Sequence, residues 1–405
     1  MSFLNLGLSH SILQAITDLS YHTPTAIQKQ AIPIILSGKD VVATAQTGTG
    51  KTAAFVLPIL EKLHVTTKPR RAKRIGALIL TPTRELATQI AHNIELYSQH
   101  THLTSLPIYG GVDLAPQKKR LIEGVDILVA TPGRLLDLVN QRAVHFDEVE
   151  ILVLDEADRM LDMGSQDDLE KILARLPKYR QNLLFSATTT DSVRALAYEF
   201  SHETQSPDAI EVNTSPKQKT ADNIKQWLIT VDKDTKSALL SHLIQEHHWQ
   251  RTLIFIEKKH AAAKLVEQLA KRGIIADAIH GDKSQAMREK ILQRFKAGEL
   301  QYLIATGVAA RGLDIGELAR VVNYDLPFKP EEYIHRIGRT GRAGATGEAI
   351  SFVAKGDFKN LCAIESRLNK IIERRKIDGF EERKTVPLSI LNYIPKAKRN
   401  THGSA

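Results

Sequence analysis

The stretch Ala45-Gln46-Thr47-Gly48-Thr49-Gly50-Lys51-Thr52 follows the apolar run 41–43 and opens a helical pattern. Closely spaced glycines let backbone N–H groups converge on one anion, and a helix that begins there adds the positive end of its dipole. In such a loop Lys51 reaches nucleotide phosphates and Thr52 ligates Mg²⁺. Ala45 stands where the general pattern has its first glycine. The stretch predicts a phosphate-binding loop, with a chance glycine turn before a helix as the alternative.

A second motif, Asp155-Glu156-Ala157-Asp158, comes directly after the apolar run 151–154. Carboxylates at the carboxyl end of a buried strand face the ligand crevice of an open parallel sheet. Asp155 suits Mg²⁺, which prefers oxygen ligands and keeps several waters. Glu156 alternates to the other side, where it could polarise an attacking water. An isolated acidic tetrapeptide is usually a solvated loop, but the upstream phosphate loop favours the functional interpretation.

Short apolar runs alternate with amphipathic stretches such as 84–97 along most of the chain, a pattern typical of βαβ units in an open α/β sheet. The alternation breaks at 201–223, which is rich in Ser, Thr, Pro, Asn and Lys, and then resumes. We therefore expect two α/β domains joined by a linker. The expected strands are 41–43, 77–80, 127–129, 151–154, 183–185 and 210–212 in the first domain, and 253–256, 276–279, 302–305, 320–323 and 349–352 in the second.

Composition agrees with two globular domains: the chain has 405 residues, of which 42% are hydrophobic. The net charge of +9 suits a polyanionic partner. The single cysteine, Cys362, favours a reducing compartment and a structural role. We find no secretory signal and no apolar run long enough to span a bilayer, so we expect a cytoplasmic protein without membrane contact. Residues 383–405 carry five basic residues and no acidic one, which predicts a flexible basic tail or a merely solvated terminus.

Taken together with seven further motifs, the two stretches above resemble the DEAD-box family of ATP-dependent RNA helicases, from about Phe3 to about Ile372. Within the family the chain is most similar to the bacterial RhlE type, on its compact core, its Met1-Ser2-Phe3 start and the stretch 154–164. The further motifs are 21–28, Pro82-Thr83-Arg84-Glu85-Leu86-Ala87, Gly110-Gly111, Thr131-Pro132-Gly133-Arg134, Ser186-Ala187-Thr188, 309–314 and 335–342.

The resemblance implies two tandem RecA-like domains, each a mostly parallel sheet flanked by helices, with the active site in the cleft between them. The implied boundaries are 1–212 for the ATP-binding domain, 213–223 for the linker, 224–375 for the C-terminal helicase domain and 376–405 for a short basic tail. The implied activity is hydrolysis of ATP coupled to RNA clamping and local unwinding of short duplexes. RNA would be bound with little sequence preference, by a monomer, with ribosomal or RNA-decay proteins as possible partners.

The resemblance also assigns site residues. ATP would be bound by Tyr21, Gln28, Ala45, Gln46, Thr47, Gly48, Thr49, Gly50, Lys51, Thr52 and Asp314. The catalytic residues would be Lys51, Asp155, Glu156, Arg339 and Arg342, and Mg²⁺ would be held by Thr52 and, through water, by Asp155. Domain closure would be coupled to RNA through Asp158, Ser186, Ala187, Thr188 and His335. RNA would be contacted by Pro82, Thr83, Arg84, Gly110, Gly111, Thr131, Pro132, Gly133, Arg134, Gly281, Gln285, Arg288, Thr306 and Arg311.

Four positions depart from the family pattern. In the first motif Ser20 stands where the family usually has glycine, and Ala26 stands where it often has proline. Ser165 replaces the usual aromatic residue after Gly164. Gly307 stands where the family usually has Asp, which removes a carboxylate and adds backbone freedom. We expect this change to weaken the coupling of ATP to RNA, so that Gly307→Asp would lower the RNA concentration needed for half-maximal ATPase activity.

Two alternatives remain at this point. The same two-domain core serves helicases and translocases that act on DNA, although the first motif and Asp155-Glu156-Ala157-Asp158 favour RNA. An ATP-gated RNA clamp with little unwinding is the other alternative, and only Gly307 favours it.

Overall fold

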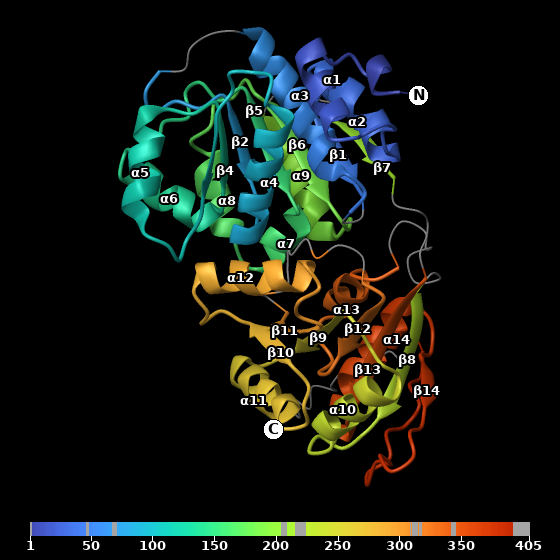
Figure 1. The fold of residues 1–405 in the computed structure, drawn as a ribbon. Coiled ribbons are helices and arrows are strands. Elements are labelled where there is room, and N and C mark those ends of the chain that lie inside the picture. Colours follow the sequence, from blue (N-terminus) through green and yellow to red (C-terminus); the bar gives the residue numbers. More distant parts are fainter. Residues whose placement is uncertain are drawn as a thin grey trace, which may run out of the picture. The chain divides into compact units, whose positions relative to one another are not determined.

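The computed structural model divides the chain into two compact units, the first carrying the elements up to β7 and the second those from β8 onward (Figure 1). It describes residues 2–45, 48–66, 71–203, 209–214, 224–307, 309, 315, 318–341 and 346–391. Each unit is built around one seven-stranded sheet in which every strand pairing is parallel.

The first sheet has the strand order β3-β4-β2-β5-β6-β1-β7. Its apolar strands are buried on both faces, as continuous apolar runs in a parallel sheet require. All six strands expected in this region are present, and β3 was not expected. The strands are β1 (Val41–Thr44), β2 (Ala77–Leu80), β3 (Ser105–Ile108), β4 (Ile127–Ala130), β5 (Ile151–Asp155), β6 (Gln181–Ser186) and β7 (Ile210–Asn213).

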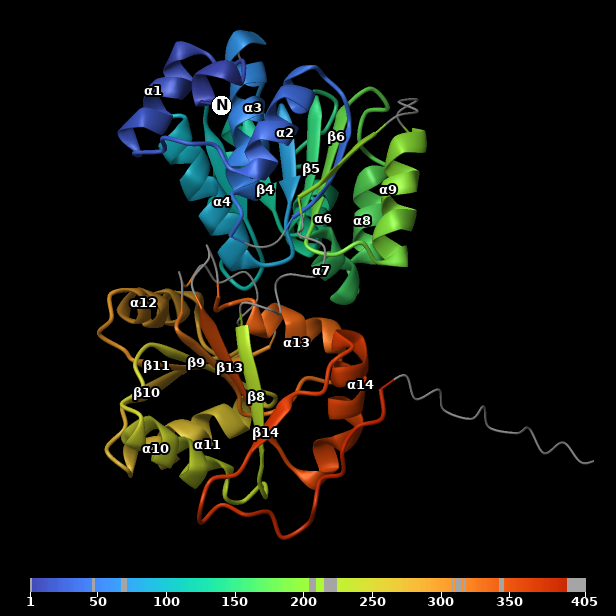
Figure 2. The same cartoon turned by 90° about the vertical axis from the view of Figure 1, so that its right-hand side faces the viewer.

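Helices cover both faces of this sheet (Figure 2). Odd-numbered strand residues such as Ile79 and Val153 pack against one group of helices, and even-numbered residues such as Leu80 and Leu152 pack against the other. The first group is α1 (His10–Asp18), α2 (Ala26–Leu36), α3 (Lys51–Thr66) and α4 (Arg84–Tyr97). The second is α5 (Leu114–Glu123), α6 (Pro132–Asn140), α7 (Ala157–Asp162), α8 (Gln166–Leu173) and α9 (Asp191–Glu203).

The second sheet repeats the plan with the order β10-β11-β9-β12-β13-β8-β14. The helices α10 (Lys236–Glu246) and α11 (Lys259–Ala270) pack on one face, and α13 (Pro330–Ile337) and α14 (Phe358–Leu368) on the other; α12 spans Gln285–Lys296. The five strands expected here are present, and β8 and β14 were not expected. The strands are β8 (Ile224–Thr230), β9 (Thr252–Ile256), β10 (Ala276–Ile279), β11 (Tyr302–Thr306), β12 (Arg320–Asn323), β13 (Gly347–Val353) and β14 (Glu373–Arg375).

Parallel strands all end at the same edge of a sheet, and this fact places the motifs. In the first unit the phosphate loop follows β1, the Ser186 motif follows β6 and the acidic motif follows β5, and these three strands are neighbours. The motifs expected to contact RNA follow β2, β4 and β3, which are the next strands along the same edge. The strand order therefore separates a nucleotide half from an RNA half along one edge.

Residues 383–391 do not behave as the free tail that the sequence suggested. Arg383 donates to Asp232 from its backbone N (2.9 Å) and its Nε (2.7 Å). Val386 is buried, and its carbonyl oxygen accepts from Arg374. This segment is packed on the second unit because it forms both ion pairs and apolar contacts there. Residues 392–405 lie outside the described part of the chain. Within that part, no helix has the length and apolar character needed to cross a membrane.

Candidate nucleotide and RNA site

The loop after β1 forms an anion-binding arrangement around Lys51. Gly48 and Gly50 have φ angles of +84° and +89°, which side chains with a Cβ rarely adopt. Lys51 is the first residue of α3 and is only 7% exposed. Its Nζ is buried and has no hydrogen-bond partner among the described residues. A buried ammonium is costly unless an anion compensates it, so this geometry suits a bound phosphate. Gln46 and Thr47 lie outside the described residues.

Gln28 joins α2 to the phosphate loop. Its Oε1 accepts from the backbone N of Thr25 (2.9 Å), which caps α2, and its Nε2 donates to the carbonyl oxygen of Gly50 (3.1 Å). A Cβ on Gly50 would lie 2.4 Å from that Nε2, so only glycine permits the contact. These bonds fix which way the amide faces, and each amide atom keeps one further hydrogen-bonding position for a ligand.

Tyr21, the residue expected to stack on the base, is 44% exposed. Its ring packs edge-on against buried Tyr97 at the end of α4, with ring centroids 6.2 Å apart. Burial and a hydrogen bond with Tyr21 raise the pKa of Tyr97 above its ordinary value, so the Tyr97 phenol stays protonated. The preceding Ser20 has φ +59°, which explains the family's glycine at this place, and Ala26 occupies the first turn of α2, where proline is favoured.

The acidic motif forms the end of β5 and the start of α7. Asp155 and Glu156 are both nearly buried. Burial raises the pKa of the Asp155 carboxyl above its ordinary value, and the nearby Lys51 ammonium opposes that shift. Glu156 has a left-handed backbone (φ 54°, ψ 49°), which is strained for a residue with a side chain. Its Oε2 accepts from Arg159 NH1 at 2.7 Å.

Asp158 ties the acidic motif to the motif after β6. Its Oδ2 accepts from the backbone N (3.1 Å) and the Oγ1 (2.8 Å) of Thr188. Ser186 Oγ donates to the carbonyl oxygen of Thr188 (2.7 Å), and Ala45 N donates to Ser186 O (3.1 Å). The phosphate loop, the acidic motif and the Ser186-Ala187-Thr188 motif therefore form one hydrogen-bonded group. His335 lies on α13 of the second unit.

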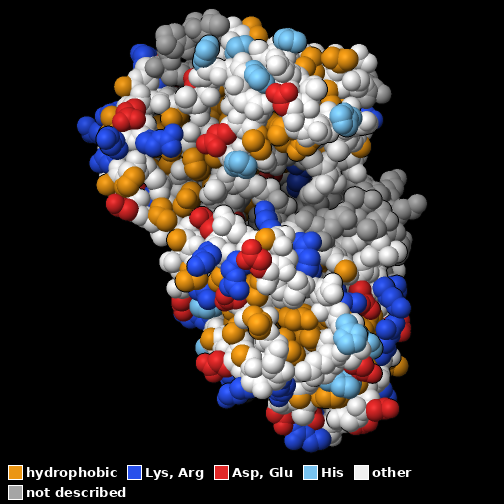
Figure 3. Space-filling model, viewed as in Figure 1, with side chains coloured by type: hydrophobic (Ala, Val, Ile, Leu, Met, Phe, Trp, Pro, Cys, Tyr) orange, Lys and Arg blue, Asp and Glu red, His pale blue; other side chains and the backbone are white. Residues whose placement is uncertain are grey.

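The expected RNA residues of the first unit also converge. A Cβ on Gly111 (φ +79°) would lie 2.2 Å from Arg84 NH1, so the guanidinium rests on this glycine. Arg134 NH2 donates to the carbonyl oxygen of Val112 (2.9 Å). Thr83 caps α4 and Thr131 precedes α6, which begins at Pro132 and Gly133. Figure 3 shows Lys and Arg side chains gathered over α5, the helix that starts three residues after Gly111 and carries Lys118, Lys119 and Arg120.

The remaining candidates that the structure describes belong to the second unit. Gln285 begins α12 and donates to Glu289 (2.9 Å), and Arg288 on the same helix is buried. Thr306 ends β11, Gly281 is exposed, and Arg339 is buried after α13. Arg311, Asp314 and Arg342 lie outside the described residues.

The sequence suggested that Gly307 lacks a carboxylate that the family usually has at this place. In the structure a carboxylate from the neighbouring helix α13 occupies the space beside this glycine. A Cβ there would lie 1.9 Å from Glu332 Oε1. That carboxylate accepts from Arg336 NH2 at 2.7 Å, and the Arg336 side chain is 2% exposed. Glu257 lies 3.6 Å from the same guanidinium, and Arg336 NH1 donates to Asp325 O (2.8 Å). A carboxylate therefore already stands beside the loop after β11, which removes the reason for expecting weakened coupling.

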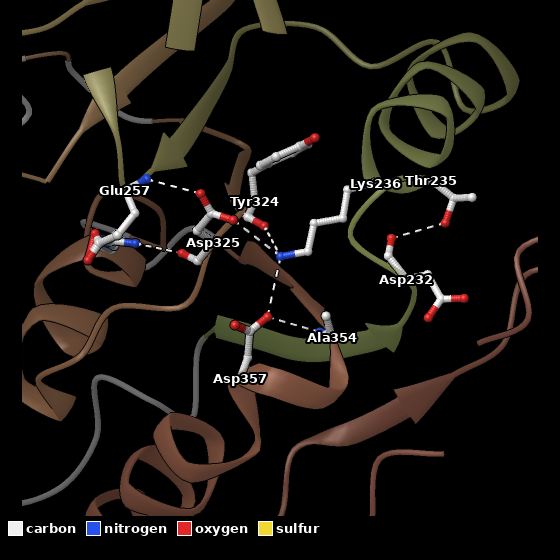
Figure 4. A network of polar contacts seen from close by, with 9 residues as sticks. Asp232, Thr235, Lys236, Glu257, Tyr324, Asp325, Ala354 and Asp357 are labelled. Atoms are coloured by element: carbon white, nitrogen blue, oxygen red, sulfur yellow. Dashed lines mark hydrogen bonds and ion pairs between the residues drawn. The ribbon is translucent and has the colours of Figure 1, made fainter. Parts of the chain in front are cut away.

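A buried cation, which the sequence did not reveal, stabilises the second sheet where β9 and β12 end (Figure 4). Lys236 Nζ is nearly inaccessible and donates to Tyr324 O (2.8 Å), Asp325 Oδ1 (3.3 Å) and Asp357 Oδ2 (3.4 Å). Asp325 Oδ2 accepts from Glu257 N (3.1 Å). Since Asp325 also receives Arg336 through its carbonyl oxygen, the two networks are joined and fix the ends of β9 and β12. Nothing in the local sequence around Lys236 signals this role.

Comparison with known proteins agrees with this geometry. Residues 25–196 match the DEAD/DEAH box helicase family, and residues 235–344 match the helicase conserved C-terminal domain. The chain is 41% identical over 380 residues to the ATP-dependent RNA helicase CshA of Listeria monocytogenes, covering 94% of this chain and 71% of the relative. The corresponding figures for the CshA of Bacillus subtilis are 41% over 382 residues, 94% and 75%.

The chain belongs to the DEAD-box family of ATP-dependent RNA helicases. It is accordingly an ATP-binding, RNA-binding hydrolase with two RecA-like domains. A solved structure of S. cerevisiae Dbp5 bound to RNA and ADP BeF3 matches this helicase with a TM-score of 0.79 and 33% identity, covering 93% of this chain and 96% of that one. The RhlE type is not confirmed, because the relatives named above are CshA proteins.

The filled site at Gly307 reverses the expectation for this helicase. We expect Gly307→Asp to lower the free energy of unfolding by about 1 kcal/mol, because the new carboxylate displaces Glu332 from Arg336. The RNA concentration for half-maximal ATPase rate should rise by a factor of about 2–5, which corresponds to a similar loss of free energy. Urea unfolding and RNA titrations of the ATPase rate measure the two effects.

The matched variant is Gly307→Asp combined with Glu332→Ala, which leaves one carboxylate to face Arg336 and should recover most of both losses. Gly356→Asp serves as a control in the same unit, since a Cβ there meets no heavy atom closer than 3.5 Å. A lower half-saturating RNA concentration in the single Gly307→Asp variant would restore the deficit hypothesis.

Proposed function

We propose that this helicase hydrolyses ATP at the carboxyl edge of β1, β6 and β5, with Lys51 binding phosphate oxygens and Glu156 orienting the attacking water. The observation that carries the assignment is the buried Lys51 Nζ, which lacks a hydrogen-bond partner among the described residues beside two left-handed glycines. Asp155 lies within electrostatic range of that ammonium. Arg339 and Arg342 would supply guanidinium groups for phosphate charge, and Asp314 would bind the ribose hydroxyls.

A magnesium ion fits the same donor set. The described residues contain no group of three or more His, Cys, Asp or Glu side chains suited to a metal. We propose an ion held mainly by phosphate oxygens and water, with Thr52 as one protein ligand and Asp155 acting through water. The ion would neutralise phosphate charge, while Asp155 and Thr52 would orient it.

We further propose that RNA lies along the neighbouring strand ends, over Arg84, Gly111, Thr131 and Arg134, with Gln285, Arg288 and Thr306 of the second unit on the same strand of RNA. These side chains and backbone groups suit phosphates and 2′-hydroxyls, so base preference should be weak. The hydrogen bond between Asp158 and Thr188 would couple closure of the two domains to the RNA-binding half of the sheet edge.

Comparing ATPase stimulation by single-stranded RNA and by DNA of the same sequence and length tests the RNA assignment. RNA should stimulate far more strongly, because DNA lacks the 2′-hydroxyls. Equal stimulation by both would favour the DNA alternative. The clamp alternative rested on Gly307 alone, and Glu332 already places a carboxylate there. A strand-displacement assay with a short RNA duplex measures unwinding directly.

Base choice gives a further prediction. Gln28 offers one acceptor and one donor position to the base, which match the N6 amino group and N7 of adenine. Guanine presents an acceptor where adenine has its amino group, and the mismatch should cost about 1–3 kcal/mol, or roughly 5- to 150-fold in kcat/KM. Steady-state kinetics with ATP, GTP and ITP measure this, since ITP changes the six-position without adding the 2-amino group. Comparable kcat/KM values for ATP and ITP would contradict the assignment.

The finer features of the chain are proposals as well. We propose the domain boundaries 1–212 and 224–375 with a linker at 213–223, a monomeric cytoplasmic enzyme, and ribosomal or RNA-decay proteins as partners. The RhlE type is proposed on the compact core and the stretch 154–164. The single cysteine supports a reducing compartment.

A further inference from the structure

The backbone position of Glu156 does not by itself fix the orientation of its carboxylate. Its backbone is left-handed, it directly precedes α7, and its side chain accepts no capping hydrogen bond from that helix. The side chain is 4% exposed, so water does not fix its orientation. A strained backbone carrying a buried charge persists only where its surroundings hold it.

Arg159 provides that hold. Its NH1 donates to Glu156 Oε2 at 2.7 Å, and its side chain is 2% exposed. The three-residue spacing places Arg159 one turn along α7 on the same side as Glu156. The backbone N of Arg159 also donates to Asp158 Oδ1 (3.1 Å), so the residue is anchored within the motif it supports. The contact uses a single oxygen of Glu156 and leaves Oε1 outside it.

Stability alone does not account for this pair. Replacing a buried ion pair with apolar side chains of similar volume is often neutral or stabilising, because two charges must be removed from water. The pair also lies beside Asp155 and Lys51, at the place where phosphate is expected. Its location therefore indicates a role in the reaction.

We propose that Arg159 is a positioning residue for ATP hydrolysis, which holds Glu156 by Oε2 so that Oε1 faces the attacking water. This inference rests on the proposed role of Glu156. Without the guanidinium, the carboxylate turns away from the water, and a misplacement on the order of 1 Å costs roughly 100-fold in rate. ATP and RNA binding do not depend on Arg159, since neither site uses its side chain.

The test compares Arg159→Met with Arg180→Met. Arg180 is also a buried arginine of the first unit, but it bonds Asn182 and Pro177 O at the opposite end of β6. Arg159→Met should lower kcat by about 10- to 100-fold, with KM for ATP and half-saturating RNA unchanged within about twofold. Arg180→Met should leave kcat unchanged. A normal kcat in Arg159→Met, a parallel change in KM, or an equal kcat loss in Arg180→Met would overturn the proposal.

Arg159→Lys covers the case in which Arg159→Met fails to fold. Lysine keeps the charge but cannot reproduce the planar fork, so kcat should fall between those of the native and Met proteins with KM unchanged. A native kcat in Arg159→Lys, when the Met variant cannot be used, overturns the inference. Glu156→Gln is measured in parallel. Normal turnover there would defeat the role of Glu156 itself, whereas a stalled Glu156→Gln with a fully active Arg159→Met would defeat only the role of Arg159.

Discussion

Glu156→Gln should slow ATP turnover by about 100- to 1,000-fold while ATP and RNA still bind. Glutamine has the shape of glutamate and can still accept from Arg159, so the left-handed backbone and the α7 start should persist. It lacks the negative charge that polarises the attacking water. The measurement is kcat at saturating RNA together with ATP affinity.

The same variant should also release RNA more slowly in the presence of ATP, because in the proposed mechanism hydrolysis is the step that ends RNA clamping. Dissociation of a fluorescent RNA after a chase with unlabelled RNA measures that rate. A mild kcat loss accompanied by weakened ATP binding would show that Glu156 is a structural carboxylate.

Lys51→Ala should instead remove nucleotide binding. The Lys51 ammonium is buried and lacks a hydrogen-bond partner among the described residues, so the contacts proposed for it with phosphate would be desolvated and charge-assisted. Losing two such hydrogen bonds should cost about 3–6 kcal/mol, which raises the Kd for ATP by at least roughly 100-fold. Titration with a fluorescent ATP analogue measures the change.

Lys62→Ala is the matched control for that experiment. Lys62 lies on the same helix, α3, and burial lowers its pKa, yet it bonds Gln181 at the start of β6, away from the phosphate loop. Its removal should affect stability and leave the Kd for ATP unchanged. If both lysine variants bind ATP normally, Lys51 does not bind phosphate.

The sequence predicted the strands where the physics is local. Continuous apolar runs such as 77–80 and 151–154 can be buried only between two helical layers, and they form the centre of the first sheet. The strand β3 was missed because it contains Pro107, which lacks a backbone donor and is tolerated here on the edge of the sheet. The strand β14 was missed because its three residues, Glu373–Arg375, are all charged, which is also typical of an edge.

The residues of the candidate site also fall into two classes, those that local sequence reveals and those that depend on tertiary contacts. Glycines, the P-loop lysine and the acidic motif are recognisable because their chemistry depends on spacing along the chain. The contacts of Gln28 with Gly50, of Arg84 with Gly111 and of Glu332 with the place at Gly307 depend on tertiary packing. Gly307 illustrates the limit most clearly, since the missing carboxylate was visible in the sequence and its replacement from α13 was not. Arg159 could have been noticed, because a three-residue spacing from Glu156 on an expected helix predicts a contact.

The two hydrogen bonds of Gln28 constrain how this enzyme could evolve. The same amide completes the capping box of α2 and is the group proposed to bind the base, so a substitution that relaxes base choice would also loosen the start of a core helix. Evolution toward another nucleotide would pass through a less stable variant unless a second substitution first restored the cap of α2. Mutations at Thr25 or within the first turn of α2 would therefore have to precede any change of nucleotide preference, and their order should be visible in reconstructed ancestors.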